Sequence, residues 1–212
     1  MRLRKGRALA GFVVVMVGTA SGARASQEQG PVKRPAQEAP ADDPRVLAAI
    51  ARQRALGLPG PEHRALESLV GTYNVAFTSY PRGAEPTHLT GTGENRLLFG
   101  GRFLLSEWAV GEGESRIEAL TVYGYDNGRK EFFAFGINSL RTNLADHWGN
   151  YDEVSRSFIM SRKARDETTG TVLVYRALLK VENPDSHVLH VFFDVPGGRP
   201  RKALEMTFTR QK

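Results

Sequence analysis

Short, β-prone segments fill almost the whole chain between Val70 and Arg210. They are rich in aromatic residues, and breaks at glycine, Asn-Gly, aspartate and proline separate them without a convincing helix in between. An antiparallel meander of this length can remove its exposed edges by closing into a barrel. The sequence therefore predicts an all-β fold, an antiparallel barrel of about ten strands. The strands are expected near residues 72–80, 88–98, 102–110, 116–125, 131–138, 142–151, 156–163, 171–181, 187–194 and 202–210.

Residues 44–70 are expected to form one or two short helices ahead of the barrel domain, which should span residues 71–212. The cluster Pro59-Gly60-Pro61 ends the first helical pattern, and Pro61 is a favourable start for a second one. Both helices would lie beside the barrel as a lid or plug. In the alternative interpretation, the first helix packs loosely or not at all.

Residues 1–25 have the pattern of a secretory signal peptide. A basic opening of seven residues precedes the apolar stretch Ala8–Ala20, and Ala23-Arg24-Ala25 supplies the small-x-small pattern before Ser26. The apolar stretch is shorter than the roughly 20 residues of a membrane span, which favours cleavage over a retained anchor. The protein is therefore expected in the periplasm or outside the cell, with no stable membrane anchor after cleavage.

Charge and composition limit the classes of partner that this protein is expected to bind. The chain carries a net charge of +6, but five basic residues and no acidic one lie in residues 1–25, so cleavage would leave +1. Binding to nucleic acid thereby loses its electrostatic support. Residues 26–43 are rich in Gln, Pro, Ala and charge, which predicts a disordered linker. No cysteine is present, so the core alone must hold the fold in an oxidising compartment.

The segment from Gly60 to Tyr73, GPEHRALESLVGTY, resembles the opening of the bacterial domain-of-unknown-function 1579 family. The resemblance covers residues 60–210, and the order and spacing of its motifs make it specific. It implies a calycin-like barrel, similar in architecture to lipocalins and fatty-acid-binding proteins, and no assigned activity. Further matches are Gly100-Gly101-Arg102-Phe103-Leu104, Gly124-Tyr125-Asp126 with Lys130, Asn138-Ser139, and Glu205-Met206-Thr207-Phe208-Thr209-Arg210.

The resemblance also implies a structural role for Gly71, Tyr73 and Arg210. In lipocalin-like barrels, an aromatic residue after a Gly-x pair packs at the closed end, and an arginine near the end of the last strand often stacks on it. The family usually has Trp where this chain has Tyr73. A Tyr ring supports cation–π stacking less well than Trp, which implies a weaker plug.

The strand expected over residues 131–138 is apolar on both faces, because Phe132 lies on one face and Phe133, Phe135 and Ile137 lie on the other. A strand in an isolated barrel should expose one of its faces to water. We therefore expect its outer side to be covered, either by the N-terminal helix or by a second subunit in a homodimer.

Seven residues are the sequence-based candidates for a ligand site, on the premise that aromatic side chains line a cavity for an apolar or flat molecule. The alternative is that the same rings fill a packed core. The candidates are Trp108, Tyr123, Phe133, Phe135, Trp148, Tyr175 and Arg176.

The sequence predicts no metal and no cofactor. It lacks a His-Glu-x-x-His motif, and His187 and His190 fall on opposite faces of one strand, so they cannot share a metal ion. A resemblance-based role for one of them as a haem ligand is the weaker interpretation, because a single histidine carries little information.

Three functions remain open from the sequence. The favoured one is an exported, non-enzymatic protein that binds a small hydrophobic molecule inside the barrel. The second is an enzyme acting on a small molecule, with Arg176 and an interior acid, Glu107 or Asp146, as the working pair. The third is an interaction module that uses the apolar outer face of residues 131–138.

Overall fold

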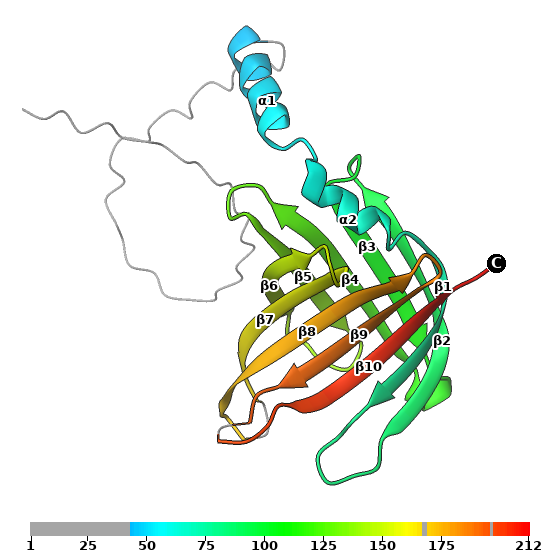
Figure 1. The fold of residues 1–212 in the computed structure, drawn as a ribbon. Helices are drawn as coiled ribbons and strands as arrows, with labels where there is room; N and C mark the ends of the chain where they lie inside the picture. Colours follow the sequence, from blue (N-terminus) through cyan, green and yellow to red (C-terminus); the bar gives the residue numbers. More distant parts are fainter. Residues whose placement is uncertain (1–42, 167–168, 196) are drawn as a thin grey trace, which may run out of the picture. The chain divides into compact units, whose positions relative to one another are not determined.

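The computed structural model describes residues 43–166, 169–195 and 197–212. Ten antiparallel strands close into a barrel (Figure 1), because each strand pairs with the next along the chain and the first also pairs with the last. This confirms the predicted all-β barrel of about ten strands. The strands are β1 (Gly71–Ser79), β2 (Thr87–Leu98), β3 (Phe103–Val110), β4 (Ile117–Asp126), β5 (Glu131–Asn138), β6 (Ala145–Asp152), β7 (Ser157–Arg165), β8 (Val172–Asn183), β9 (Ser186–Phe193) and β10 (Arg201–Arg210).

Short helices precede the barrel, as the sequence predicts. They are α1 (Pro44–Leu56), the 3₁₀ turn η1 (Pro61–His63) and α2 (Arg64–Glu67), and a further turn η2 (Gly113–Ser115) joins β3 to β4. No residue of α1 is buried, which agrees with the interpretation that the first helix packs loosely. Among the described residues, no helix has the length and apolar character needed to cross a membrane. The expected signal peptide and linker, residues 1–43, lie outside the described part of the chain apart from Asp43.

The α2 end of the barrel holds a tightly packed core. Leu66 in α2 and Leu69 just after it pack into this core and are 0% and 1% exposed. Because side chains alternate across a strand, β1 directs Tyr73, Val75 and Phe77 inward. The other buried residues of the cluster around Leu66 and Leu69 are Leu104, Phe132, Ala134, Phe158, Met160, Leu179 and Val181. A second buried cluster runs along β1, β3 and β10 and comprises Tyr73, Val75, Phe77, Val110, Met206 and Phe208.

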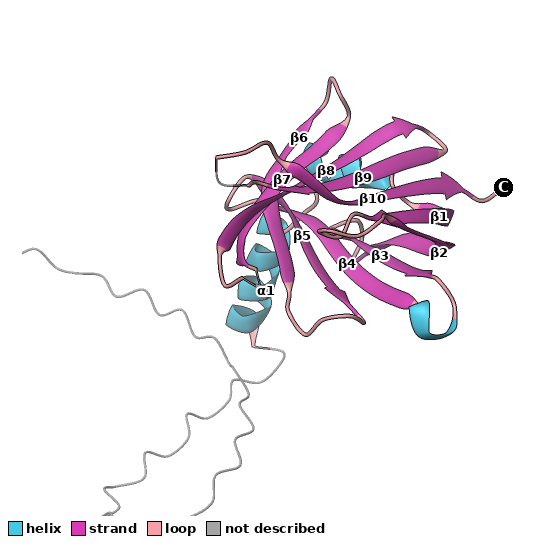
Figure 2. Ribbon diagram, turned by 90° about the horizontal axis from the view of Figure 1, so that it is seen from below, coloured by secondary structure: helices cyan, strands magenta, loops and turns pink. Residues whose placement is uncertain are grey.

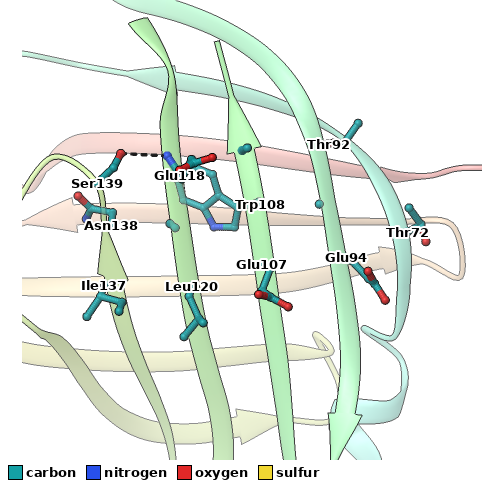
Figure 3. A pocket seen from close by; sticks show the side chains of 13 residues that line it. Thr72, Thr92, Glu94, Glu107, Trp108, Glu118, Leu120, Ile137, Asn138 and Ser139 are labelled. Atoms are coloured by element: carbon teal, nitrogen blue, oxygen red, sulfur yellow. Dashed lines mark hydrogen bonds between the residues drawn. The ribbon is translucent and has the colours of Figure 1, made fainter. Parts of the chain in front are cut away.

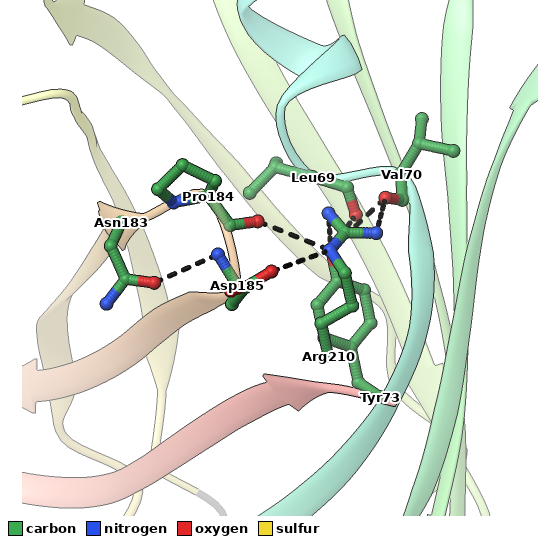
Figure 4. A network of polar contacts seen from close by, with 7 residues as sticks. All are labelled: Leu69, Val70, Tyr73, Asn183, Pro184, Asp185 and Arg210. Carbon is green, nitrogen blue, oxygen red and sulfur yellow. Dashed lines mark hydrogen bonds and ion pairs between the residues drawn. The ribbon is translucent and has the colours of Figure 1, made fainter. Parts of the chain in front are cut away.

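Arg210 closes this end of the barrel by joining β10 to β1 (Figure 4). Its guanidinium carbon lies 5.1 Å from the centre of the Tyr73 ring, and Nη2 donates to the Tyr73 hydroxyl at 3.0 Å. Nη1 donates to the Val70 carbonyl at 2.7 Å, and Nε donates to the Pro184 carbonyl at 3.2 Å. Asp185 adds an ion pair at 3.8 Å. The stacking of Arg210 on Tyr73, inferred from the family resemblance, is confirmed.

The Tyr73 hydroxyl changes the expectation that a tyrosine makes a weaker plug than tryptophan. It donates to the Leu69 carbonyl at 2.9 Å while it accepts from Arg210. The hydroxyl thus ties the chain after α2 to the last strand, which an indole at this position could not do in the same way. Gly71 is required beside it, because φ is +148° there and a Cβ atom would collide with the Arg210 guanidinium.

Aromatic side chains on the outer face of β5 pack against one another and against a neighbouring strand. Phe133 and Phe135 face outward, with ring centres 4.9 Å apart, and the Phe133 ring lies 5.3 Å from that of Trp148 on β6. The guanidinium of Arg129 lies 3.8 Å from the Trp148 ring centre and covers it. The helix α1 has no buried residue and does not supply the cover, while cover by a second subunit stays a prediction. The rings need no helix because packing against one another and against a cation removes most of their surface from water.

Candidate functional site

A row of inward-facing side chains crosses strands β4 to β8 above the packed core. Tyr123 pairs with Ala134, and Ala134 pairs with His147. Trp148 pairs with Ser161, which makes His147 and Arg162 the next facing positions, and Arg162 pairs with Tyr175. Since paired residues project from the same face of a sheet, all five point into the barrel. Ala134 itself is buried, 6% exposed, and Tyr123 packs against the cluster that contains it.

Burial is uneven across the barrel interior. Phe77, Val110 and Leu173 are buried although they lie away from α2, whereas a group of other inward-facing residues is only partly buried: Trp108, Tyr123, His147, Arg162 and Tyr175. Partial exposure of an inward-pointing side chain requires space that solvent can enter. These partly exposed side chains mark the part of the interior that solvent reaches, which we call the open half, on strands β3 to β8 towards the end that faces the viewer in Figure 2.

His147 and Arg162 carry unsatisfied polar atoms inside the barrel. The His147 Nε2 and Arg162 Nε atoms are buried and have no hydrogen-bond partner among the described residues. Burial and the neighbouring Arg162 charge lower the pKa of His147 to about 4, so the ring is neutral at pH 7. Arg162 is held in place by a hydrogen bond from Nη1 to the Leu144 carbonyl at 2.9 Å and by the Tyr175 ring, 5.2 Å from Cζ. Buried polar atoms are normally paired, so these two atoms indicate a missing partner.

The described strands carry no carboxylate on their inward faces. Arg210 has its partners at the closed end, whereas Arg162 forms no ion pair with any described residue. Burial raises the pKa of Tyr123 to about 12, so this hydroxyl also stays neutral. The open half therefore combines aromatic walls with an uncompensated cation.

Three of the seven candidate residues face the interior. Trp108 on β3, Tyr123 on β4 and Tyr175 on β8 point inward, and the register places Tyr123 and Tyr175 in the row with His147 and Arg162.

The other four candidates face outward, contrary to the expectation. Phe133, Phe135 and Trp148 form the outer cluster, and Arg176 pairs with Asp194 at 2.7 Å with 60% of its side chain exposed. The reason is parity, because inward positions on β5 and β6 are Phe132, Ala134 and His147, and on β8 they are Tyr175 and Ala177.

The acid–arginine pair of the enzyme hypothesis does not form in the barrel. Glu107 faces outward and pairs with Arg96 at 3.4 Å, and Asp146 faces outward opposite Phe135. Neither carboxylate lies beside Arg176, and none of the three reaches the interior. The sequence-based candidates did not include His147 and Arg162. The available signal was alternation along β7, because Arg162 follows the buried Phe158 and Met160 at even spacing.

A second hollow lies on the outer wall of β1 to β5 (Figure 3). It has a volume of about 670 Å³, is open to solvent, and is lined mostly by outward-facing side chains, among them Glu94, Glu107 and Glu118. Glu107 and Glu118 already pair with Arg96 and Arg116. No group of metal-ligating residues occurs among the described residues. The outer hollow therefore offers no assembled chemistry, and the interior row is the better candidate site.

These features define a class of protein: a ten-stranded antiparallel barrel, plugged at one end by an arginine–tyrosine pair and lined with aromatic and cationic groups towards the other. The family model described as "Protein of unknown function (DUF1579)" matches residues 58–210. The chain belongs to this family, which confirms the resemblance drawn from the sequence.

Solved structures resemble the chain at low identity. An S-type phycobiliprotein lyase from Guillardia theta is 12% identical, covers 73% of this chain and 99% of its own, and superposes with a TM-score of 0.47. A redesigned β-barrel is 13% identical, covers 70% of this chain and 96% of its own, and has a TM-score of 0.37. No curated protein matches the chain.

Proposed function

We propose that this protein is exported and binds a small, largely apolar molecule in the solvent-accessible half of its barrel. One observation carries the proposal: aromatic side chains that point into a closed barrel remain partly exposed, next to buried polar atoms that have no partner. Ligand sites in proteins combine apolar and aromatic walls with a few convergent polar groups. Trp108, Tyr123 and Tyr175 supply the walls, and His147 and Arg162 supply the polar groups.

Filling the interior tests the proposal. Gly136 faces inward between Thr121 and Ala145, and a Cβ atom there would meet the Thr121 hydroxyl at 3.2 Å and no backbone atom closer than 3.8 Å. Gly136→Phe should therefore place a ring in the open space without a backbone collision. We expect at least a tenfold loss of affinity for the neutral fluorescent probe N-phenyl-1-naphthylamine, measured by titration.

Ile137→Phe is the matched control, because Ile137 is the next residue, faces outward and is 52% exposed. This variant should bind the probe within about twofold of the wild type, since the exposed outer position has no contact with the interior. Circular dichroism establishes that both variants are folded. Absence of saturable binding by the wild type, or equal affinity of the folded Gly136→Phe variant, contradicts binding in the interior.

Export has its own test. The pattern in residues 1–25 supports removal of this segment before Ser26. N-terminal sequencing of the protein recovered from the periplasm or the medium should begin at Ser26. Ala25→Arg should block cleavage, because the site requires a small residue. A mature protein that begins at Met1 and stays in the cytoplasm contradicts export and leaves interior binding untouched.

A further inference from the structure

Arg162 is an uncompensated cation inside the barrel. Its guanidinium is oriented by the Leu144 carbonyl on Nη1 and by the Tyr175 ring, while buried Nε has no acceptor among the described residues. The side chain as a whole is only partly buried, but a buried N–H without an acceptor is costly. The inward positions of the ten described strands hold no acid that could pair with it. Among the described strands, therefore, no inward-facing group supplies an acceptor for Arg162 Nε, and a bound molecule could supply one.

His147 adds a second polar group at the same place. Its Nε2 atom is buried and unpartnered, and the ring faces the position of Arg162 across β6 and β7. A neutral imidazole can donate one hydrogen bond from Nε2 when Nδ1 carries no proton. Together, the free edge of the guanidinium and the imidazole present donors to one small acceptor group. A planar carboxylate fits this arrangement, because it can accept two parallel hydrogen bonds from one arginine.

The barrel rim carries further positive charge. The Arg82 guanidinium lies 5.0 Å from the ring centre of Phe193, and Phe193 pairs with both Tyr175 and Arg201. Both arginines are exposed, so they can attract an anion from solution without holding it. Tyr123 belongs to the same inward-facing row as Arg162, and Trp108 faces the interior from β3. The inward surface thus combines a cationic group with aromatic side chains, next to exposed arginines at the rim.

We propose that the molecule bound in the barrel is an amphipathic carboxylate, whose carboxylate group binds to Arg162 and His147 and whose apolar body contacts Tyr123, Tyr175 and Trp108. The proposal rests on the function proposed above, namely binding in the barrel interior, and it adds the chemical class of the ligand.

Displacement of N-phenyl-1-naphthylamine by two competitors that differ only in the head group tests this proposal. Dodecanoate and dodecanol are compared below the concentration at which they aggregate. The wild type should bind dodecanoate at least tenfold more tightly than dodecanol. Arg162→Gln should weaken dodecanoate at least tenfold and leave dodecanol and the probe within about twofold of the wild type, because only the acid needs the charge.

Two further variants make the result specific. Arg176→Gln removes an arginine from the outer face of the neighbouring strand β8 and should leave both competitors unchanged. Arg162→Lys keeps the charge without the planar fork, so it should recover part of the preference and also serves if Arg162→Gln does not fold. Equal competition by the acid and the alcohol in the wild type, or a preference that survives in folded Arg162→Gln, overturns the proposal. Failure of the probe itself to bind would instead reject interior binding.

Discussion

Replacing Arg210 with alanine should lower the free energy of unfolding by about 2–4 kcal/mol. The side chain makes hydrogen bonds to the Tyr73 hydroxyl and to the carbonyls of Val70 and Pro184, and it stacks on the Tyr73 ring. These groups come from the segment after α2, from β1 and from the β8–β9 turn. Alanine would leave them without their donor in a region where water cannot fully replace it. Urea unfolding followed by circular dichroism measures the change.

Matched variants test whether this loss of stability is specific to the contacts between Arg210 and Tyr73 that close the barrel end. Arg176→Ala removes an exposed arginine that also makes a short ion pair, at 2.7 Å with Asp194. That change should cost about 0–1 kcal/mol, since solvent screens exposed pairs. Arg210→Lys should lie between the two, because a lysine keeps the charge but cannot reach several carbonyls at once. If Arg210→Ala is no more destabilising than Arg176→Ala, the plug does not hold the barrel closed.

Acidification between pH 6.5 and pH 4 should destabilise the barrel through His187. This ring is 4% exposed and stacks on Phe208, with ring centres 4.5 Å apart. Burial, and secondarily the charge of Arg210, lower the pKa of His187 from 6.5 to about 4. Between pH 6.5 and pH 4 the unfolded chain therefore binds a proton at this histidine that the folded protein does not bind. The contribution of neutral His187 to the free energy of unfolding is fully present above pH 6.5 and falls as the pH drops towards 4. The full loss is about 3 kcal/mol at pH 4.

Unfolding midpoints measured from pH 7 down to pH 5 report mainly on the buried histidines, because most carboxylates stay charged in that interval. His187→Leu should reduce the slope; the remaining part comes from His147, whose pKa is also lowered to about 4, and from His63, whose pKa burial lowers. His88→Gln is the control, since His88 is exposed on the outer face and bonds Thr78 at 3.0 Å. A slope in His187→Leu equal to that of the wild type contradicts a neutral, buried His187.

Local sequence pattern was a good guide to the strands and their order. The breaks at Asp126-Asn127-Gly128, Gly100-Gly101 and Asn183-Pro184-Asp185 all fall between consecutive strands of the barrel. Turn chemistry and alternation depend on residues close together in the chain, so one sequence is sufficient to detect them. The placement of Arg210 on Tyr73 came from the family resemblance and is also correct.

Local pattern was a poor guide to which face of a strand meets the interior. On β5 both faces are apolar, so alternation cannot distinguish Phe132, which packs in the core, from Phe133 and Phe135 outside. On β8, Arg176 shares its face with Val172 and Val174, which suggested an inward position, yet that face is the outer one. Each strand is shifted relative to its neighbours, and a shift of one residue exchanges the two faces.

Turns and alternation between nearby residues predict an antiparallel barrel preceded by helices, and the family motifs predict its arginine-closed end. The closed barrel places His147 and Arg162, on neighbouring strands, opposite each other in the open half and Arg176 outside, an arrangement across strands that no local pattern indicated. The physical reason is that inside and outside exist only once ten strands have paired in register around a common axis, and the sequence of a single strand does not contain that register.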